Sequence, residues 1–325
     1  MIRNSAPATT LLMFTFISAT PMLRAQTTAT PARDLLETKL TKTIVFLTLD
    51  VKVSGQTKQL MGTGFFVGVP DPRIPSGQSI PYLVTNRHVA AALENCKPLD
   101  LQRTYVTMNL KEPVNGNRSS KEPLKVTGQN PWHFPTDGSV DLAVLRFTQL
   151  SAKHDHVAIP IDDLLTSSDL SAKGVVPSDR VLTLGLFSQH PGTHGLQPLV
   201  REGILAMMPD APMETTTCKE GSLYLADVHI IPGNSGSPIF IWPTRPESGG
   251  ITVSGDRTAF GLLGIISGYM YEDQNLTLRP STNWSGTILG NSEIATVVPA
   301  EEIKALLLDP VLKRERDQMF SRGRE

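Results

Sequence analysis

Three positions carry the residue types that nucleophilic catalysis requires. His88 follows the apolar run at residues 82–84, Asp141 directly precedes the apolar run at residues 142–145, and Ser235 lies in a segment rich in glycine and proline. A serine hydroxyl is a weak nucleophile at neutral pH, so an imidazole must accept its proton and a carboxylate must orient that imidazole. The order His, Asp, Ser is one of those that build this geometry. The sequence therefore predicts a catalytic triad of His88, Asp141 and Ser235.

Each of these residues, taken alone, has an ordinary structural interpretation. A histidine after a strand is often a satisfied polar residue, an aspartate before a strand is often a turn or capping residue, and Gly-Asn-Ser-Gly is often a tight turn. Asp137, in the turn-forming segment 135–138, is the second candidate for the carboxylate. The three residues occurring together favour the catalytic interpretation.

The elements that must position these residues are short β-type runs separated by turn signals such as Ser54-Gly55 and Asn115-Gly116. Two groups of runs are joined by the polar segment 151–178, and the gaps between runs are too short for the crossover connections of a parallel sheet. Two antiparallel barrels or sandwiches are therefore expected. The predicted strands are 44–53, 63–68, 80–85, 104–110 and 142–147 in the first group, and 180–187, 199–207, 222–230, 237–241, 260–267 and 293–298 in the second.

Five segments occur in an order that is typical of one family. They are Gly-Thr-Gly-Phe-Phe-Val at 62–67, Val-Thr-Asn-Arg-His-Val at 84–89, Asp-Leu-Ala-Val-Leu at 141–145, Gly-Asn-Ser-Gly at 233–236 and Gly-Leu-Leu-Gly-Ile-Ile-Ser-Gly at 261–268. Together they resemble the chymotrypsin-like (trypsin-fold) serine peptidases, particularly their exported bacterial members. The resemblance implies an all-β fold of two antiparallel six-stranded β-barrels, with the active site between them and a short C-terminal helix.

The resemblance also implies roles for further residues. The backbone N–H groups of Gly233 and Ser235 would form the oxyanion hole, which stabilises negative charge on the reacting carbonyl. A small or medium apolar substrate side chain is expected in the primary pocket, because no acidic residue marks a pocket for basic side chains. His229 could instead be a packed wall residue. The pocket residues implied by the resemblance are His229, Ile266, Ser267, Gly268 and Tyr269.

Two positions depart from the family pattern. Asn234 stands where members activated by N-terminal cleavage carry an aspartate, so it cannot form their ion pair with a new N-terminal amine. Ser237 stands where a second glycine is common. We therefore expect no activation by N-terminal cleavage, and we expect the small Ser237 side chain to be tolerated.

The N-terminal residues predict export. Residues 1–25 combine an early Arg3, an apolar run at 11–19 and a plausible cleavage site, as in a secretory signal peptide; an uncleaved amphipathic anchor is the alternative. No other stretch approaches the roughly 20 apolar residues of a membrane span. The expected protein is secreted or periplasmic. The expected divisions are 1–25 signal peptide, 26–43 lead segment with a short helix at 33–37, 44–150 first barrel, 151–178 linker, 179–298 second barrel, and 299–325 C-terminal helix and charged tail, the tail being solvated or frayed.

The charge balance points to a local site rather than to a polyanionic partner. The chain has 30 basic and 31 acidic residues and a formal charge of −1, so no global attraction to nucleic acid is expected. The partner is predicted to be a protein or peptide substrate. Neither the His190/His194 pair nor the His154/His156 pair has a spacing that favours a metal site, since Pro191 and Gly192 interrupt the first pair. No metal and no cofactor are expected.

Two features remain open at the level of sequence. Export would allow Cys96 and Cys218 to form a disulfide, but two buried free cysteines are equally compatible with their spacing. The triplets at 117–119, 275–277 and 283–285 match the N-glycosylation pattern, which matters only in a eukaryotic source. The chain is predicted to be an exported serine endopeptidase. The alternative is a catalytically inactive protein of the same fold that acts as a peptide- or protein-binding module.

Overall fold

The computed structural model describes residues 39–192, 195–242, 244–246, 253–255, 260–278 and 284–321, and only the backbone at 244–246, 253–255, 273–278 and 284–289. The predicted signal peptide, the helix expected at 33–37 and most of the lead segment lie outside the described residues. Among the residues that it does describe, no helix is long and apolar enough to cross a membrane.

The N-terminal half is built from hairpins that the sequence encodes locally. Strand β1 (Ile44–Val53) pairs antiparallel with β2 (Gln56–Val69). The two residues between them, Ser54 and Gly55, have φ values of 51° and 81°. Two positive φ values in a two-residue loop are typical of a type I′ turn, whose twist matches that of the flanking strands. Most of β1 is buried, as expected of a central strand.

The N-terminal sheet has seven strands rather than the predicted six, and its path is open. Its order is β7-β6-β1-β2-β3-β8, with β9 pairing parallel to β2. Strand β8 has only four residues, and its other edge meets the isolated partner His133 instead of β7, so hydrogen bonding does not close this sheet into a barrel. The remaining strands are β3 (Ile80–Thr85), β6 (Asp100–Val114), β7 (Asn117–Pro123), β8 (Ala143–Arg146) and β9 (Ile159–Pro160).

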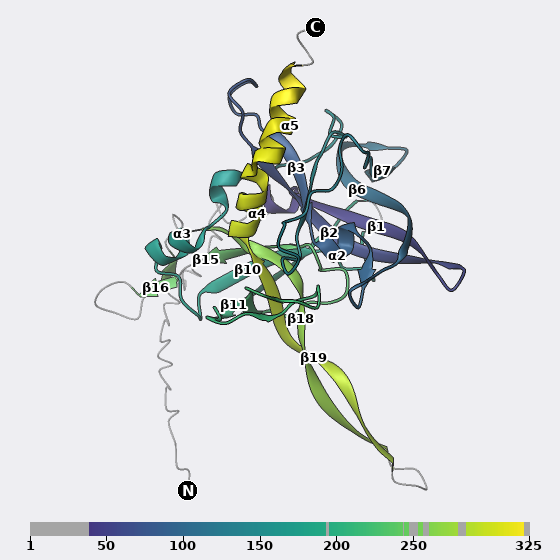
Figure 1. Cartoon of the computed structure of the whole chain (residues 1–325), viewed down its shortest axis with the longest axis vertical. Coiled ribbons are helices and arrows are strands. Elements are labelled where there is room, and N and C mark those ends of the chain that lie inside the picture. The colour runs from purple at the N-terminus through teal and green to yellow at the C-terminus, as the bar shows by residue number, and fades with distance from the viewer. Residues whose placement is uncertain are drawn as a thin grey trace, which may run out of the picture.

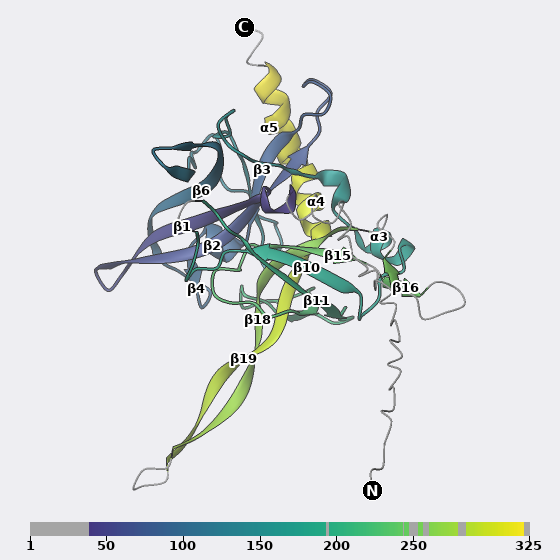
Figure 2. The same cartoon turned by 180° about the vertical axis from the view of Figure 1, so that it is seen from behind.

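The C-terminal half is the closed six-stranded barrel that the resemblance implies, with strand order β10-β11-β14-β19-β18-β15. The hairpin of β18 and β19 is much longer than the predicted strands and extends away from the body of the molecule (Figures 1 and 2). The barrel strands are β10 (Arg180–Gly185), β11 (Leu199–Met207), β14 (Tyr224–Asp227), β15 (Pro238–Trp242), β18 (Gly261–Leu278) and β19 (Trp284–Pro299).

Short elements connect and flank the two halves. Helix α2 follows β3 directly, and β4 and β5 form a small hairpin after it. The segment expected as a linker contains β9, the 3₁₀ helix η1 and helix α3. These elements are α2 (Arg87–Ala90), β4 (Leu93–Glu94), β5 (Lys97–Pro98), η1 (Ile161–Asp163), α3 (Ser167–Ala172), β12 (Met213–Glu214), β13 (Glu220–Gly221), β16 (Thr244–Pro246) and β17 (Val253–Gly255).

The C-terminal region contains two helices where one short helix and a frayed tail are predicted. Helix α4 (Ala300–Leu308) is followed by α5 (Pro310–Ser321). The tail expected from residue 313 is helical rather than frayed as far as Ser321; most of its side chains are exposed, but Arg316 is buried. The Arg316 guanidinium donates hydrogen bonds to the Tyr82 hydroxyl at 3.0 Å and to the carbonyl of Leu307 at 2.9 Å, so its charge is not left unpaired on burial.

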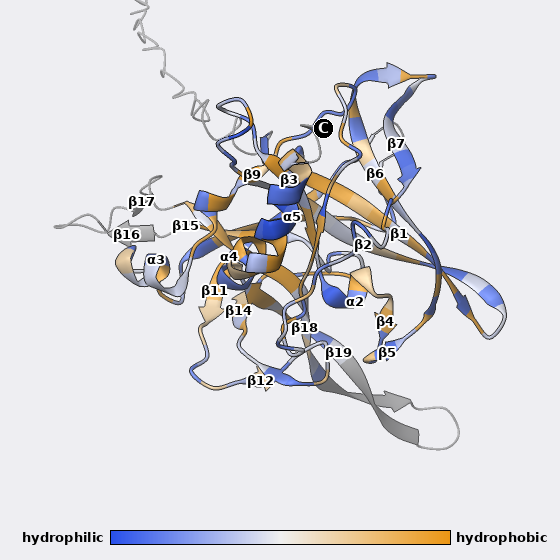
Figure 3. Ribbon diagram, turned by 45° about the horizontal axis from the view of Figure 1, so that its top comes forward, coloured by the Kyte–Doolittle hydropathy of each residue, from blue (hydrophilic) through white to orange (hydrophobic). Residues whose placement is uncertain are grey.

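The apolar interior has three clusters, and the largest spans both halves. One cluster contains only N-terminal residues such as Val45 and Phe66, and a second belongs to the C-terminal barrel and the segment leading into it. The third joins Phe65 and Val84 of the sheet to Leu184 of the barrel and also includes α4 and α5 residues. Figure 3 shows apolar ribbon concentrated in these central strands. The two halves are therefore docked through a continuous core.

Candidate active site

His88 is held at the start of the short helix α2, where strand β3 ends. The preceding Asn86 is fully buried, and its side-chain amide donates a hydrogen bond to the carbonyl of Asp141 at 3.0 Å. Val89 and Ala90 are buried on the inner side of α2. The apolar strand and this anchored turn fix the backbone from which the imidazole projects.

His88 and Asp141 make two hydrogen bonds with each other. The backbone N–H of His88 donates to Asp141 Oδ1 at 2.9 Å, and His88 Nδ1 lies 2.6 Å from Asp141 Oδ2. The Asp141 side chain has no solvent exposure, whereas 19% of the His88 side chain is exposed. A carboxylate can only accept at Oδ2, so Nδ1 carries the proton and Nε2 of the neutral imidazole is left as an acceptor.

This pairing shifts both pKa values. Burial opposes the charged form of His88, but the Asp141 charge and hydrogen bond outweigh it and raise the pKa of His88 above 6.5. Burial likewise opposes the Asp141 carboxylate, yet His88 and the hydroxyl of Thr216 hold its pKa below 3.8.

Ser235 follows a β-turn between β14 and β15. The N–H of Asn234 donates to the carbonyl of Ile231 at 3.0 Å, with Pro232 and Gly233 at the centre of the turn. Gly233 has φ +101°, which glycine adopts at the third position of such a turn without steric cost. Within the part of the chain that the structure describes, the N–H groups of Gly233 and Ser235 donate no hydrogen bond.

Thr63 of strand β2 fixes this loop from the N-terminal half. Its hydroxyl donates to the carbonyl of Gly233 at 2.8 Å and accepts from the N–H of Leu186 at 2.9 Å. Its N–H donates to the carbonyl of Ser235 at 2.8 Å. One residue of the sheet therefore holds two segments of the barrel beside His88.

Ser235 and His88 line one pocket of about 440 Å³. The Ser235 hydroxyl donates to the carbonyl of Ser267 at 3.4 Å, which is long for a hydrogen bond between oxygens. Rotation of this hydroxyl toward His88 therefore breaks only a weak hydrogen bond. The rest of the pocket is mostly apolar, being lined by Leu49, Gln59, Leu60, Met61, Val89, Leu93, Glu94, Ser188, Pro232 and Gly233.

The two departures from the family pattern have simple structural consequences. Asn234 is buried and satisfied at both ends of its amide: Oδ1 accepts from the N–H of Ile231 at 2.9 Å, and Nδ2 donates to the carbonyl of Leu186 at 2.8 Å. Ser237 is fitted against Gly185, where any Cβ would lie 2.1 Å from its hydroxyl oxygen. A glycine in β10 makes room for the serine.

None of the residues named for the primary substrate pocket is among those that line the pocket shared by His88 and Ser235, although the Ser267 carbonyl accepts the hydrogen bond from the Ser235 hydroxyl. Ile266 is fully buried in β18, and Ser267 bonds through its hydroxyl to Thr296. His229 is half-exposed, and its Nδ1 lies 3.1 Å from a carboxylate oxygen of Glu293. A substrate-binding role for His229, Ile266, Ser267, Gly268 and Tyr269 stays a prediction.

Asp137, the second candidate carboxylate, acts in a turn. Its side chain accepts from the N–H of Ser139 at 2.8 Å, and this hydrogen bond holds the pKa of Asp137 below its usual value. Of the histidines considered for metal binding, His194 lies outside the described residues. Buried His154 instead lies near Glu122, at 3.6 Å. In the ranges described, no group of three or more potential ligands is arranged to hold a metal ion.

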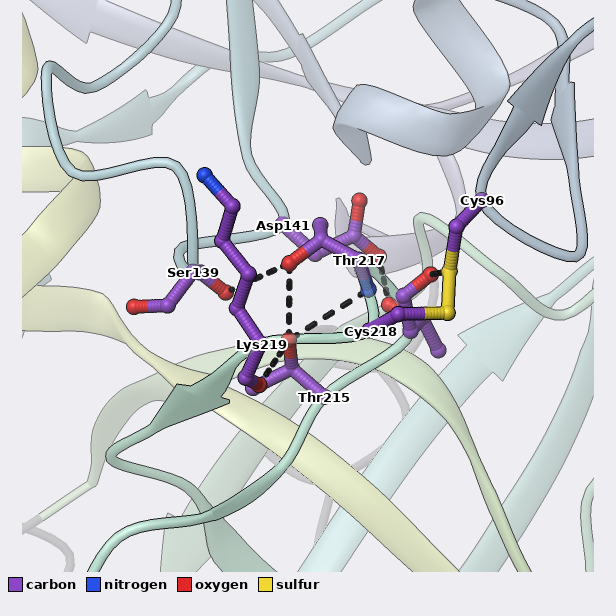
Figure 4. Close-up of a disulfide and its surroundings, with 8 residues drawn as sticks. Cys96, Ser139, Asp141, Thr215, Thr217, Cys218 and Lys219 are labelled. Carbon is purple, nitrogen blue, oxygen red and sulfur yellow. Dashed lines mark hydrogen bonds between the residues drawn. A yellow bond between two sulfur atoms is a disulfide. The ribbon is translucent and has the colours of Figure 1, made fainter.

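The two cysteines form a disulfide, which the sequence left open. Cys96 and Cys218 are bonded, with their Cα atoms 6.1 Å apart, and join the β4–β5 turn to the β12–β13 hairpin (Figure 4). The same hairpin carries Thr216, whose hydroxyl donates to Asp141 Oδ2. The sequence reasoning missed Thr216. The signal was available in the cysteines, because a bridge from Cys96 to Cys218 brings residue 216 close to the segment that follows His88.

Residues 62–241 match the family model described as a trypsin-like peptidase domain. No curated protein matches the chain.

Solved structures resemble the chain at low sequence identity. An HtrA-type protease, AlgW with a tripeptide, is 17% identical with a TM-score of 0.44; the match covers 84% of this chain and 62% of that one, less than two thirds of its length. The MamO protease domain from Magnetospirillum magneticum (apo form) is 18% identical with a TM-score of 0.43 and coverages of 83% and 98%. The Rv3671c protease from M. tuberculosis (active form) is 17% identical with a TM-score of 0.45 and coverages of 85% and 85%.

Proposed function

The chain belongs to the trypsin-like peptidase family, and from that premise we propose that it is an exported serine endopeptidase. One observation carries the proposal. The fully buried Asp141 carboxylate accepts two hydrogen bonds from His88, and His88 and Ser235 line the same pocket. This arrangement supplies a base, its orienting carboxylate and a nucleophile at the edge of one cavity.

The proposed reaction follows from these groups. His88 Nε2 accepts the Ser235 hydroxyl proton while Oγ forms a bond to the substrate carbonyl carbon. The N–H groups of Gly233 and Ser235 stabilise the oxyanion. His88 then returns the proton to the amine as the C–N bond breaks, and water releases the acyl group by the same steps in reverse order.

The pocket beside His88 supports a protein or peptide substrate with an apolar side chain close to the cleaved bond. Leu49, Leu60, Met61, Val89 and Leu93 contribute apolar side chains to its lining. Burying a side chain of that class removes apolar surface from water on both partners. Export, with residues 1–25 removed and the mature chain secreted or periplasmic, is part of the proposal.

Labelling with a fluorophosphonate tests the nucleophile directly. Ser235 Oγ forms a bond to phosphorus, fluoride leaves, and mass spectrometry locates the adduct. We expect labelling of the chain from residue 26 onward, loss of labelling in Ser235→Ala and His88→Ala, and no loss in Ser168→Ala, which changes a surface serine in α3. We also expect Ser235→Ala to lower peptide hydrolysis by about 10⁴-fold or more.

A second candidate function is a peptide-binding protein that does not cut. The observation that favours it is the Ser235 hydroxyl, which points to the Ser267 carbonyl rather than to His88. A folded protein that binds peptides, remains unlabelled and hydrolyses none of them would establish this candidate and overturn the first. Profiling with a peptide library then measures the apolar preference.

A further inference from the structure

The Asp141 carboxylate accepts a hydrogen bond from the C-terminal half in addition to the two that it accepts from His88. Asp141 Oδ1 accepts from the backbone N–H of His88, while Oδ2 accepts from both His88 Nδ1 and the hydroxyl of Thr216. A carboxylate with no solvent exposure depends on such donors to stay charged. Among the described residues of the C-terminal half, Thr216 is the only one whose side chain donates to this carboxylate.

The nearby serine on β18 does not supply this hydrogen bond. The Ser267 hydroxyl lies 3.0 Å from the Thr296 hydroxyl and donates to the Thr296 carbonyl, while its own carbonyl faces Ser235. Thr216 packs close to this strand, since a Cβ added at Gly268 would lie 3.0 Å from its methyl carbon. The threonine therefore reaches Asp141 from a separate loop.

That loop is tightly ordered by its own hydrogen bonds. The N–H of Thr215 donates to the carbonyl of Lys219, and the N–H of Cys218 donates to the carbonyl of Thr215, both at 2.9 Å. The hydroxyl of Thr217 donates to the carbonyl of Ser139 at 3.4 Å, two residues before Asp141. The hydroxyls of Thr215 and Thr217 also bond to each other at 2.8 Å, and of these three threonines Thr216 is the one that donates to the carboxylate.

The disulfide fastens this loop to the segment after His88. Cys218 lies two residues beyond Thr216, and Cys96 Sγ lies 3.4 Å from the Thr216 carbonyl oxygen. Cys96 and Cys218 both have positive φ values, 62° and 55°, so the bridge joins two tight turns. The two cysteines are 122 residues apart in the sequence, so the bridge also restricts the unfolded chain.

We propose that Thr216 is a positioning residue for the His88–Asp141 pair and that the Cys96–Cys218 disulfide holds it in place. The proposal rests on the proposed peptidase function and names how its base is oriented. Thr216 donates to Asp141 Oδ2, which limits rotation of the carboxylate and keeps it aligned with His88 Nδ1. The hydroxyl also offsets part of the carboxylate charge that faces the imidazole.

The first test compares Thr216→Val with Thr216→Ser and with Thr217→Val. Valine keeps the shape of threonine but removes the hydroxyl, serine keeps the hydroxyl, and Thr217 serves as the neighbouring control. We expect Thr216→Val to lower kcat about tenfold with KM within twofold of the wild type, and Thr216→Ser to restore kcat to within twofold. Equal kinetics for Thr216→Val and Thr217→Val would overturn the proposal.

NMR titration of the His88 ring reads the same interaction without turnover. With the donor gone, more negative charge faces the imidazole, so the pKa of His88 rises in Thr216→Val and the acid limb of kcat/KM moves to higher pH. If the wild type hydrolyses no peptide, the peptidase function fails but this titration still decides the role of Thr216. An unchanged His88 titration refutes the positioning role even in an active enzyme.

A double-mutant cycle tests the disulfide. A dithiol reductant transfers two electrons and two protons to the bridge, which yields two cysteine thiols and the oxidised dithiol; Cys96→Ala combined with Cys218→Ala removes the bridge permanently. We expect either treatment to lower kcat by several-fold, and its effect to be largely absent in Thr216→Val, because both act through one hydrogen bond. Fully additive effects would show that the disulfide does not act through Thr216.

Discussion

The two halves of the molecule differ in how they close and in what they contribute. The N-terminal sheet is open and supplies His88 and Asp141 from strand ends, whereas the C-terminal barrel is closed and supplies the Ser235 loop and the Thr216 hairpin. Each half has an apolar cluster that does not involve the other, but the largest cluster joins them. The geometry of the site therefore depends on docking between the halves as well as on the folding of each one.

A substitution in the Ser235 loop, which contacts both halves, should have the largest effect on stability. Gly236 has φ +89°, and a Cβ there would lie 1.9 Å from the carbonyl oxygen of Thr63 in the N-terminal sheet. We expect Gly236→Ala to destabilise the fold by more than about 4 kcal/mol, because backbone must move as well as adopt a strained conformation. Chemical denaturation measures this, with hydrolysis followed in parallel.

Gly55 provides the matched control for that change. It has φ +81° in the β1–β2 turn, with no atom within 4 Å of an added Cβ. Gly55→Ala should therefore carry the backbone strain alone, about 1 kcal/mol, and leave activity unchanged. Similar losses of stability in both variants would mean that the contact with Thr63 is unimportant.

Truncation of a core leucine should affect activity differently in the shared cluster and in the barrel's own cluster. Leu184 belongs to the shared cluster and Leu205 to the barrel cluster, and neither is exposed. Each Leu→Ala change should cost about 3 kcal/mol by denaturation. At a temperature where both variants are folded, we expect Leu184→Ala to lower kcat/KM several-fold and Leu205→Ala to leave it unchanged. Equal activities would argue against control by docking.

The pH dependence should reflect the pair in the N-terminal half. His88 must be neutral to act as a base, and its pKa is raised above 6.5 by Asp141 despite burial. We expect kcat/KM to fall about tenfold per pH unit below an apparent pKa higher than 6.5. The titration of His88 should be nearly the same in Ser235→Ala, since the serine is uncharged and its hydroxyl donates to the Ser267 carbonyl rather than to His88 or Asp141. An acid limb of kcat/KM with an apparent pKa below 6.5 would contradict the assignment of that limb to His88.

The same pair should affect stability in a defined pH window. The lowered pKa of Asp141 adds stability above about 3.8 that is lost as pH falls through its folded value, and the raised pKa of His88 adds stability below about 6.5 that is lost as pH rises through its folded value. The contribution is therefore greatest between these two pH values. Denaturation of Asp141→Asn and of the wild type from well below pH 3.8 to well above pH 6.5 measures it, and a stability difference that stays constant over this wider span would contradict it.

Removing a surface ion pair from either half should have the smallest effect on stability and activity. Lys42 and Asp155 pair at 3.0 Å in the N-terminal half, and Arg180 and Glu202 pair at 2.6 Å in the barrel. Asp155→Asn and Glu202→Gln should each change stability by about 0.5 kcal/mol or less, and the change should shrink at high salt. Neither should alter kcat. A larger effect in one half alone would assign surface charge a role in that half.

Local sequence predicted several elements well because their boundaries are local. Strands β1, β3 and β11 begin and end where predicted, since apolar or alternating runs there are bounded by turn residues. The β18–β19 hairpin is longer than predicted because its outer part is held by pairing between the two strands, which composition does not reveal. Helix α5 was missed because its buried residues have distant partners: Arg316 donates to the Tyr82 hydroxyl, and Leu312 belongs to the core shared by the two halves.

The family, the mostly β architecture and the candidate residues His88, Asp141 and Ser235 followed from sequence, because each lies in a short segment whose residue types and order are themselves the signal. Tertiary structure decided the open path of the first sheet, the disulfide and the reach of Thr216 to Asp141. These depend on which surfaces meet when two halves dock over a shared core. Contacts of that kind join residues far apart in the chain, so no local pattern can specify them.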